Sequence, residues 1–229
     1  YMAEGRGVPQ DRVQLLVNQD ATEFNVRDAV ELAAEQVEPG GTLWFVFIGH
    51  GAPNEQADDG LLVLVDAQQT ARGIAARSLP QAELLATLGS SGGRPLAIID
   101  ACYSGKTGSG QPLVPGMQPS AVVETPVPAA ALVFSAARND QFAGPLPGDE
   151  RPAFSYLMLG ALRGWADADG NDRVTVGEAV DYTRKAMTTT IKGRTQTPEA
   201  RGDDLRMVLS AGTEDGPDLA AIVLAGDGG

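Results

Sequence analysis

The stretch from Pro95 to Gly108 reads PLAIIDACYSGKTG, and it decides the fold. Its segment from Leu96 to Asp100 is a short apolar run ending on a carboxylate, which predicts a buried strand. The only cysteine of the chain, Cys102, follows two residues later in a run of turn-forming residues. The residues therefore predict a strand that delivers a thiol to the edge of a sheet, with an acid just before it.

The rest of the chain places this strand in an α/β fold. Further apolar runs that predict strands span residues 13–18, 42–51, 61–66, 130–136 and 205–210. Runs with helical spacing lie between them, at residues 26–37, 79–88, 154–166 and 174–187. Strands that alternate with helices indicate a mostly parallel sheet. The run at 42–51 is nearly continuous in apolar residues, so we expect both of its faces to be covered.

Composition narrows the class of protein. The 229 residues suffice for one domain, and the net charge of −13 argues against binding to nucleic acid or anionic membranes. No apolar run approaches the roughly 18 residues of a membrane span. A single cysteine forms no internal disulfide, which fits a reducing compartment, so a cytoplasmic location is expected. No secretory signal is visible at Tyr1, but the start looks trimmed, so a lost signal remains an alternative.

Two residues at predicted strand ends are suited to nucleophilic catalysis. Sites in open α/β sheets form outside the carboxyl ends of the strands. Cys102 follows one such end, and His50, the only histidine, follows another. A thiol needs a base to become a good nucleophile. The backbone N–H groups of Gly51 and Cys102 are candidates to hold an oxyanion. The open alternative is a buried structural cysteine and an unrelated histidine.

These residues also resemble a known family. FIGHGAP around His50 and IDACYSG around Cys102 resemble the His-Gly and Asp-x-Cys signatures of caspase-like cysteine peptidases, most closely the metacaspase-like branch found in bacteria. VFSAARNDQ, DADGNDRVTVGEAVDY and RTQTPEARGDDLRMVLS support the likeness, which covers most of Val13 to Ser210. The resemblance implies an α/β/α sandwich over residues 1–210, with a peripheral Gly- and Asp-rich tail at 211–229. It also implies a cysteine endopeptidase in which Cys102 is the nucleophile and His50 its base.

The resemblance gives Asp100 a role in specificity. Animal caspases have glutamine two residues before the cysteine, whereas this chain has Asp100. In the caspase fold this residue lies in the pocket for the side chain that precedes the cleaved bond. An acid there would pair with arginine or lysine, as the resemblance to metacaspases implies. Asp140 is a candidate second acid at the pocket rim. The alternative is that Asp100 caps the turn after its strand.

The start of the chain departs from the family. The resemblance implies a strand and a long helix before residues 13–18, so the first strand of the sheet is expected to be absent from this chain. One explanation is that its own N-terminal fragment remains bound as a separate chain, because members of the family often cut themselves. Lys106, in the Gly- and Pro-rich run after Cys102, is a candidate cleavage site. Arg72 and Arg77, in another predicted loop, are competing sites.

The segment DADGNDRVTVGE, residues 167–178, resembles a twelve-residue calcium loop. Its candidate ligands are Asp167, Asp169, Asn171, the Arg173 carbonyl, Thr175 and Glu178. The sixth position, where the turn favours glycine, holds Asp172. The alternative is an Asp-Gly turn between two helices. One histidine and one cysteine argue against a transition-metal site, and the proposed chemistry requires no cofactor.

Three functions stay open on the sequence. The first is an endopeptidase acting on proteins or peptides after a basic residue. The second is a catalytically silent caspase-like subunit that binds peptides or regulates a partner. The third is a calcium-responsive scaffold, which depends on the 167–178 loop alone.

Overall fold

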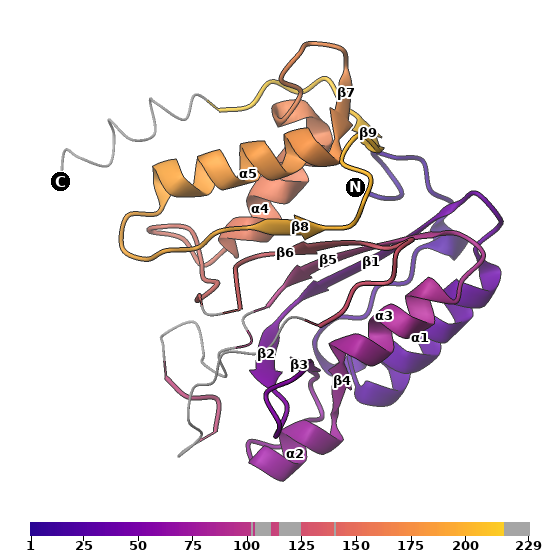
Figure 1. The fold of residues 1–229 in the computed structure, drawn as a ribbon, viewed down its shortest axis with the longest axis vertical. Coiled ribbons are helices and arrows are strands. Elements are labelled where there is room, and N and C mark those ends of the chain that lie inside the picture. The colour runs from indigo at the N-terminus through magenta and orange to yellow at the C-terminus, as the bar shows by residue number, and fades with distance from the viewer. Residues whose placement is uncertain (102, 104–110, 115–124, 140, 218–229) are drawn as a thin grey trace.

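A computed structural model describes residues 1–101, 103, 111–114, 125–139 and 141–217 (Figure 1). Its central sheet has four strands in the order β1-β5-β6-β8. These strands are β1 (Thr42–Ile48), β5 (Arg94–Asp100), β6 (Leu132–Ser135) and β8 (Glu199–Arg201). The first three run parallel and β8 runs antiparallel to β6, so the expected mostly parallel sheet is confirmed.

Two smaller antiparallel sheets flank the central one. One lies beyond the carboxyl end of β1 and consists of β2 (His50–Pro53), β3 (Gly60–Val63) and β4 (Ser78–Pro80). The other pairs β7 (Arg173–Thr175) with β9 (Val208–Ala211). The first of them carries the only histidine, so it bears directly on the site.

Helices cover both faces of the central sheet and make an α/β/α sandwich (Figure 1). On one face lie α4 (Ala153–Gly160), which continues into a π-helical turn (Ala161–Trp165), and α5 (Val176–Thr190). On the other lie α1 (Glu23–Gln36) and α3 (Gln81–Gly89), while the short α2 (Ala71–Ala76) lies beside β2–β4. No helix in the described part of the chain is long and apolar enough to cross a bilayer.

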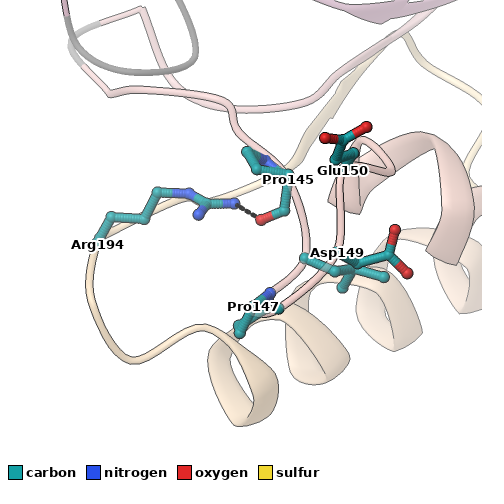
Figure 2. Close-up of a pocket in the computed structure, with 7 residues that line it drawn as sticks. Pro145, Pro147, Asp149, Glu150 and Arg194 are labelled. Carbon is teal, nitrogen blue, oxygen red and sulfur yellow. Dashed lines mark hydrogen bonds between the residues drawn. The ribbon is translucent and has the colours of Figure 1, made fainter.

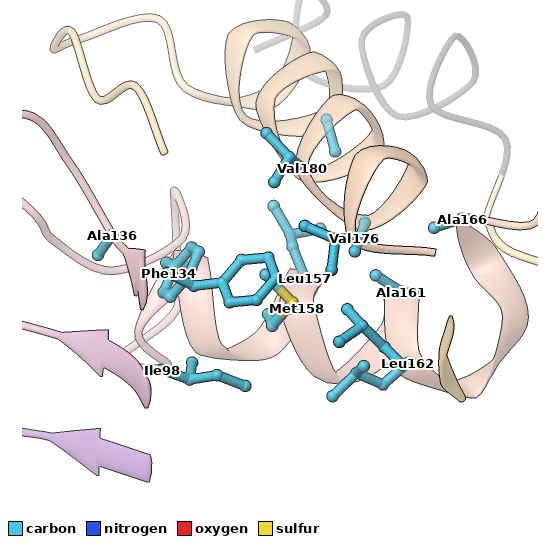
Figure 3. Close-up of a cluster of buried hydrophobic side chains, with 14 of the residues drawn as sticks. Ile98, Phe134, Ala136, Leu157, Met158, Ala161, Leu162, Ala166, Val176 and Val180 are labelled. Atoms are coloured by element: carbon cyan, nitrogen blue, oxygen red, sulfur yellow. The ribbon is translucent and has the colours of Figure 1, made fainter. Parts of the chain in front are cut away.

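Strand β5 lies at the centre of the core because its side chains alternate between two hydrophobic layers. Leu96 and Ile98 pack with α4 and α5, whereas Ala97 and Ile99 pack with α1 and α3. Figure 3 shows the first layer, where Phe134 of β6 extends among helix side chains such as Leu157 and Met158. Burial on both faces explains why β5 is apolar from Pro95 to Ile99, between the exposed Arg94 at its start and its terminal acid.

The predicted strand at 13–18 is wrong. Its first residues take no regular structure and Asn18–Asp20 form a 3₁₀ turn, with Leu15 78% exposed. Within the described chain β1 pairs with β5 on one side only, so no ladder includes residues 13–18. The expectation that both faces of 42–51 are covered also fails, because Val46 and Ile48 are about half exposed. That run divides at Gly49, where the chain leaves β1 and enters β2.

Two further expectations need correction. Residues 205–210 were expected to be a strand alternating with the helices, but the strand found is β9, and it joins β7 outside the central sheet. The antiparallel central strand is instead β8, which is short and carries two charged residues, so no apolar pattern announces it. The predicted loop around Arg72 and Arg77 is largely helix α2, which Thr70 caps by accepting a hydrogen bond from the Gly73 N–H.

Candidate active site

The carboxyl ends of two neighbouring parallel strands form the site. Ile48 of β1 lies opposite Asp100 of β5, and the Gly49 N–H donates to the Asp100 carbonyl at 3.1 Å. His50 comes two residues after Ile48, and Cys102 comes two residues after Asp100. Cys102 lies outside the described residues. Because Ile48 and Asp100 are paired, the segments that lead to His50 and Cys102 leave the sheet from adjacent positions at the same edge.

The histidine begins a rigid hairpin. His50 is exposed and pairs with Val63, and the buried Gly51 that follows pairs with Leu62. An exposed imidazole at a sheet edge is accessible to a substrate, as a catalytic base must be. The expected oxyanion role of the Gly51 N–H stays a prediction.

The carboxylate of Asp100 is buried, at 6% exposure, and is held by helix α4. Its Oδ2 accepts hydrogen bonds from the Ser155 N–H at 2.9 Å and the Ser155 hydroxyl at 2.6 Å. Burial raises the pKa of Asp100 above its usual value of 3.8, while Ser155 and, more distantly, the charge of Arg194 act in the opposite direction. Ser155 belongs to the first turn of α4, where free N–H groups favour a negative charge.

Arg194 and Gln196 support the neighbouring loop. The Arg194 guanidinium donates to the Pro145 carbonyl at 2.7 Å (Figure 2). It also donates to Gln196 Oε1 at 3.0 Å. The same Oε1 accepts the Gly144 N–H at 3.2 Å, and Gln196 Nε2 donates to the Ala136 carbonyl at 3.2 Å. Gln196 is 6% exposed. One buried amide thus joins the end of β6 to the segment that leads into α4.

An open pocket of about 660 Å³ lies beside this arrangement. It is lined by residues 145–150 and Arg194 (Figure 2). Neither His50 nor Asp100 lines it. Its charges are mixed, because Arg194 faces a loop that contains Asp149 and Glu150.

The remaining predicted residues of the peptidase site are dispersed. Asp140 and Lys106 lie outside the described residues. Arg72 is exposed within α2, and Arg77 is exposed at the end of that helix, where it approaches the Asp66 carboxylate at 3.7 Å. A helical backbone must unwind before a peptidase can hold it extended, so α2 makes Arg72 a less accessible cleavage site than a loop would.

The 167–178 segment brings together part of the predicted calcium ligand set. Carboxylate oxygens of Asp167, Asp169 and Glu178 lie within 4.8 Å of one another. Asp172 takes φ +61°, the left-handed conformation for which that position usually requires glycine. Asn171 and Thr175 use their side-chain oxygens locally, on the N–H groups of Arg173 and Glu178.

The carboxylate oxygens of Asp167 and Glu178 already accept hydrogen bonds from groups inside the loop. Asp167 accepts the N–H groups of Gly170, Asn171 and Asp172, and these bonds lower its pKa against the opposing effect of desolvation. Glu178 forms a capping box with Thr175 at the start of α5. Both interpretations of this segment, a calcium loop and a turn between helices, remain compatible with its geometry.

The sequence did not single out three residues of this region: Ser155 binds Asp100, Arg194 acts on it through its charge, and Gln196 holds Arg194. Each comes from a segment far from β5 in the chain. The only signal was indirect: Arg194 and Gln196 lie in the RTQTPEARGDDLRMVLS stretch that contributes to the family resemblance. The Ser155 contact with Asp100 and the approach of the Arg194 charge depend on how α4 and the segment before β8 pack, which no local pattern specifies.

Comparison with known proteins agrees with this arrangement. The Caspase domain family matches residues 10–210. A crystal structure of protein GSU0716 from Geobacter sulfurreducens shares the fold, with a TM-score of 0.59 and 19% sequence identity, covering 88% of this chain and 83% of that one. No curated protein matches the sequence. Because the family match spans most of the chain, this protein belongs to the caspase-domain family of cysteine peptidases.

Proposed function

We propose that this protein is a cysteine endopeptidase that cleaves after arginine or lysine. The observation that carries the proposal is the register of β1 and β5, which places the starting points of His50 and Cys102 side by side. The Cys102 thiolate attacks the peptide carbonyl carbon, and the N–H groups of Gly51 and Cys102 stabilise the oxyanion. His50, which has taken the proton of the Cys102 thiol, gives it to the leaving nitrogen as the C–N bond breaks and the thioester forms. Water hydrolyses the resulting thioester and regenerates the thiol.

Asp100 supports the preference for a basic residue. Its carboxylate is desolvated at the end of β5, next to the segment that leads to Cys102. A buried negative charge gains most from a partner with several N–H donors, which the guanidinium of arginine supplies. Asp140 would add a second charge for the same side chain.

The test is hydrolysis of a fluorogenic peptide with arginine before the reporter bond. Cys102→Ala and His50→Ala should each abolish turnover, because the pair acts as a unit. Asp100→Asn should lower kcat/KM for the arginine peptide by an amount equivalent to roughly 3–5 kcal/mol, which is the cost of leaving the buried guanidinium of the substrate uncompensated. A matched peptide with aspartate in place of arginine should be a poor substrate for every variant. A wild-type protein that binds the arginine peptide without cleaving it would instead favour the silent regulatory subunit.

Among the described residues β1 pairs on one side only, and this supports a partner strand at its other edge. Val46 and Ile48 on β1 and Leu15 and Val17 before α1 are exposed apolar side chains, between 50% and 78% exposed. An unpaired strand edge with apolar neighbours favours pairing with another extended chain. We propose an N-terminal fragment of the same protein as that strand. Native mass spectrometry of the protein purified from cells expressing its full gene would detect it, and a species without a fragment would exclude it.

Self-cleavage after Lys106, Arg72 or Arg77 is a separate proposal. Mass spectrometry of the stored wild-type protein, beside Cys102→Ala, tests it at several protein concentrations. Truncation of the wild-type protein alone would support self-cleavage. Identical lengths in both samples would exclude it.

A further inference from the structure

Asp59 and Gly60 lie where the turn between β2 and β3 ends. They contact Tyr103 and Thr125, which lie at the two ends of the segment that follows Cys102. Gly60 lies against the ring of Tyr103, the residue bonded to Cys102. Asp59 Oδ1 accepts a hydrogen bond from the Thr125 hydroxyl at 2.8 Å. Both Tyr103 and Thr125 are buried, at 6% and 3% exposure.

The contact at Gly60 leaves no room for a side chain. A Cβ built there would lie 2.5 Å from Tyr103 Cε1 and 2.6 Å from Cδ1, well inside van der Waals contact. The backbone of Gly60 has no positive φ, so conformational freedom does not explain the glycine. The Tyr103 ring packs in the core layer that α1 and α3 cover. Because it is buried there, a displaced ring would move the backbone to which Cys102 is bonded.

The same hairpin carries His50. Gly60 of β3 pairs with Pro53 of β2, and three residues before Pro53 the ladder begins at His50 paired with Val63. A two-stranded ladder of paired residues moves as one body. The β2–β3 hairpin therefore carries the base, His50, and also contacts Tyr103, the neighbour of the nucleophile.

Asp59 anchors this turn to the rest of the domain. Its carboxylate accepts the Ala82 N–H in the first turn of α3, with both oxygens at 3.2 Å, and the Gly60 N–H at 2.9 Å. Thr125 is the third partner of this carboxylate, and its own carbonyl oxygen accepts a hydrogen bond from the Arg201 side chain of β8 at 2.8 Å. The turn is thus tied to α3 and, through Thr125, to the central sheet.

We propose that Gly60 is a positioning residue of the peptidase: by admitting the Tyr103 ring it fixes the nucleophile relative to His50, with Asp59 and Thr125 holding the turn in place. This inference rests on the proposed function of the Cys102–His50 pair. Positioning errors of about 1 Å can cost on the order of a hundredfold in rate. Gly60→Ala should therefore lower kcat roughly tenfold to a hundredfold while KM changes little.

The experiment compares Gly60→Ala, Tyr103→Ala and the double variant with Gly92→Ala as the matched control. Gly92 is exposed, has no positive φ, and a Cβ there meets only an ordinary contact at 3.6 Å. The readouts are kcat and KM, melting temperature, and the pH dependence of iodoacetamide alkylation. Cys102 is the only cysteine, so alkylation reports on it alone.

The expected result is a shifted alkylation profile and lower kcat for Gly60→Ala, with no such change for Gly92→Ala. In the Tyr103→Ala background, adding Gly60→Ala should have little further effect, because the clashing atoms are gone. Thr125→Val should move the same profile, unlike the control Thr188→Val, whose hydroxyl bonds an exposed helix carbonyl.

Two results would overturn the inference. One is a Gly60→Ala protein with a lower melting temperature but an unchanged alkylation profile. The other is an equal effect of Gly60→Ala with and without the Tyr103 ring. If the wild-type protein cleaves no peptide yet the profile shifts as expected, the positioning role stands and the proposed function fails.

Discussion

Ser155→Ala should destabilise the protein in a way that depends on pH. The Ser155 hydroxyl lies 2.6 Å from Asp100 Oδ2, a length typical of an O–H donor bound to a charged oxygen. Because Asp100 is only 6% exposed, solvent screens this bond little. A hydrogen bond to a buried charged group contributes about 1.5–3 kcal/mol, and a bond between neutral groups about 1 kcal/mol. The variant should lose the larger amount where Asp100 is ionised and the smaller one where it is protonated.

The sign follows from the raised pKa of Asp100. A carboxyl whose folded pKa lies above its usual 3.8 contributes stability below that value and loses it as pH rises through the folded pKa. Ser155 opposes that loss by stabilising the charged form. Its removal should raise the pKa of Asp100 further and enlarge the loss, so the deficit of Ser155→Ala should grow as pH rises through this range.

Urea denaturation of wild-type and variant proteins, from weakly acidic to weakly alkaline pH, measures that deficit. Ser90→Ala is the matched control, because the Ser90 hydroxyl is exposed and donates to a neutral carbonyl of Thr87 at 2.8 Å. Its small loss should not change with pH. A Ser155→Ala deficit that is equally constant would refute the charge-assisted bond. Under the proposed function, the acid limb of kcat/KM for an arginine peptide should also move to higher pH in Ser155→Ala.

Three further outcomes are expected. Phe134→Ala should cost about 3–5 kcal/mol in urea denaturation, because this ring is 1% exposed between the sheet and α4, whereas Phe24→Ala, at 71% exposure, should cost little; similar losses would contradict the packing. Arg151→Ala should raise the pKa of Asp149 from about 2 towards 3.8, since the side-chain hydrogen bond from Arg151 is the main cause of the low value, and an unchanged carboxyl titration by NMR would be inconsistent with it. Calcium should raise the melting temperature of the wild-type protein more than that of Glu178→Gln, which keeps a capping side chain but loses a charged ligand; equal shifts would argue against a calcium loop.

The sequence predicted most of the central fold because burial leaves a strong pattern there. Strand β5 is covered on both faces, so its apolar run is unbroken and its position was found to within two residues. Helix α5 was predicted because apolar residues recur on one face, and the structure adds that Thr175 begins it with a capping box. The segment at 13–18 shows the limit of such patterns, since this apolar run belongs to no ladder of the described residues and leaves Leu15 exposed.

Some residues of the site were predictable from local sequence, and others were not. His50 and Asp100 follow from local rules, because each lies where an apolar strand ends. Ser155 and Asp59 act at the site through segments that packing brings together, and an Asp-Gly turn in the sequence gives no sign that its carboxylate will be buried. Their roles follow from three-dimensional contacts and were not predictable from spacing.

The register between β1 and β5 sets a strict rule for chain length. Each residue of a strand advances the chain by about 3.3 Å and reverses the direction of its side chain. Deleting one residue from β1 would therefore withdraw His50 by about one such step and present it to the wrong side, even if every remaining residue still suited a strand. Insertions at residues 145–150, a loop outside the central strands, change no such spacing. Among natural variants of this domain, differences in length should accumulate in that loop and be absent from β1 and β5, however far the side chains inside those strands diverge.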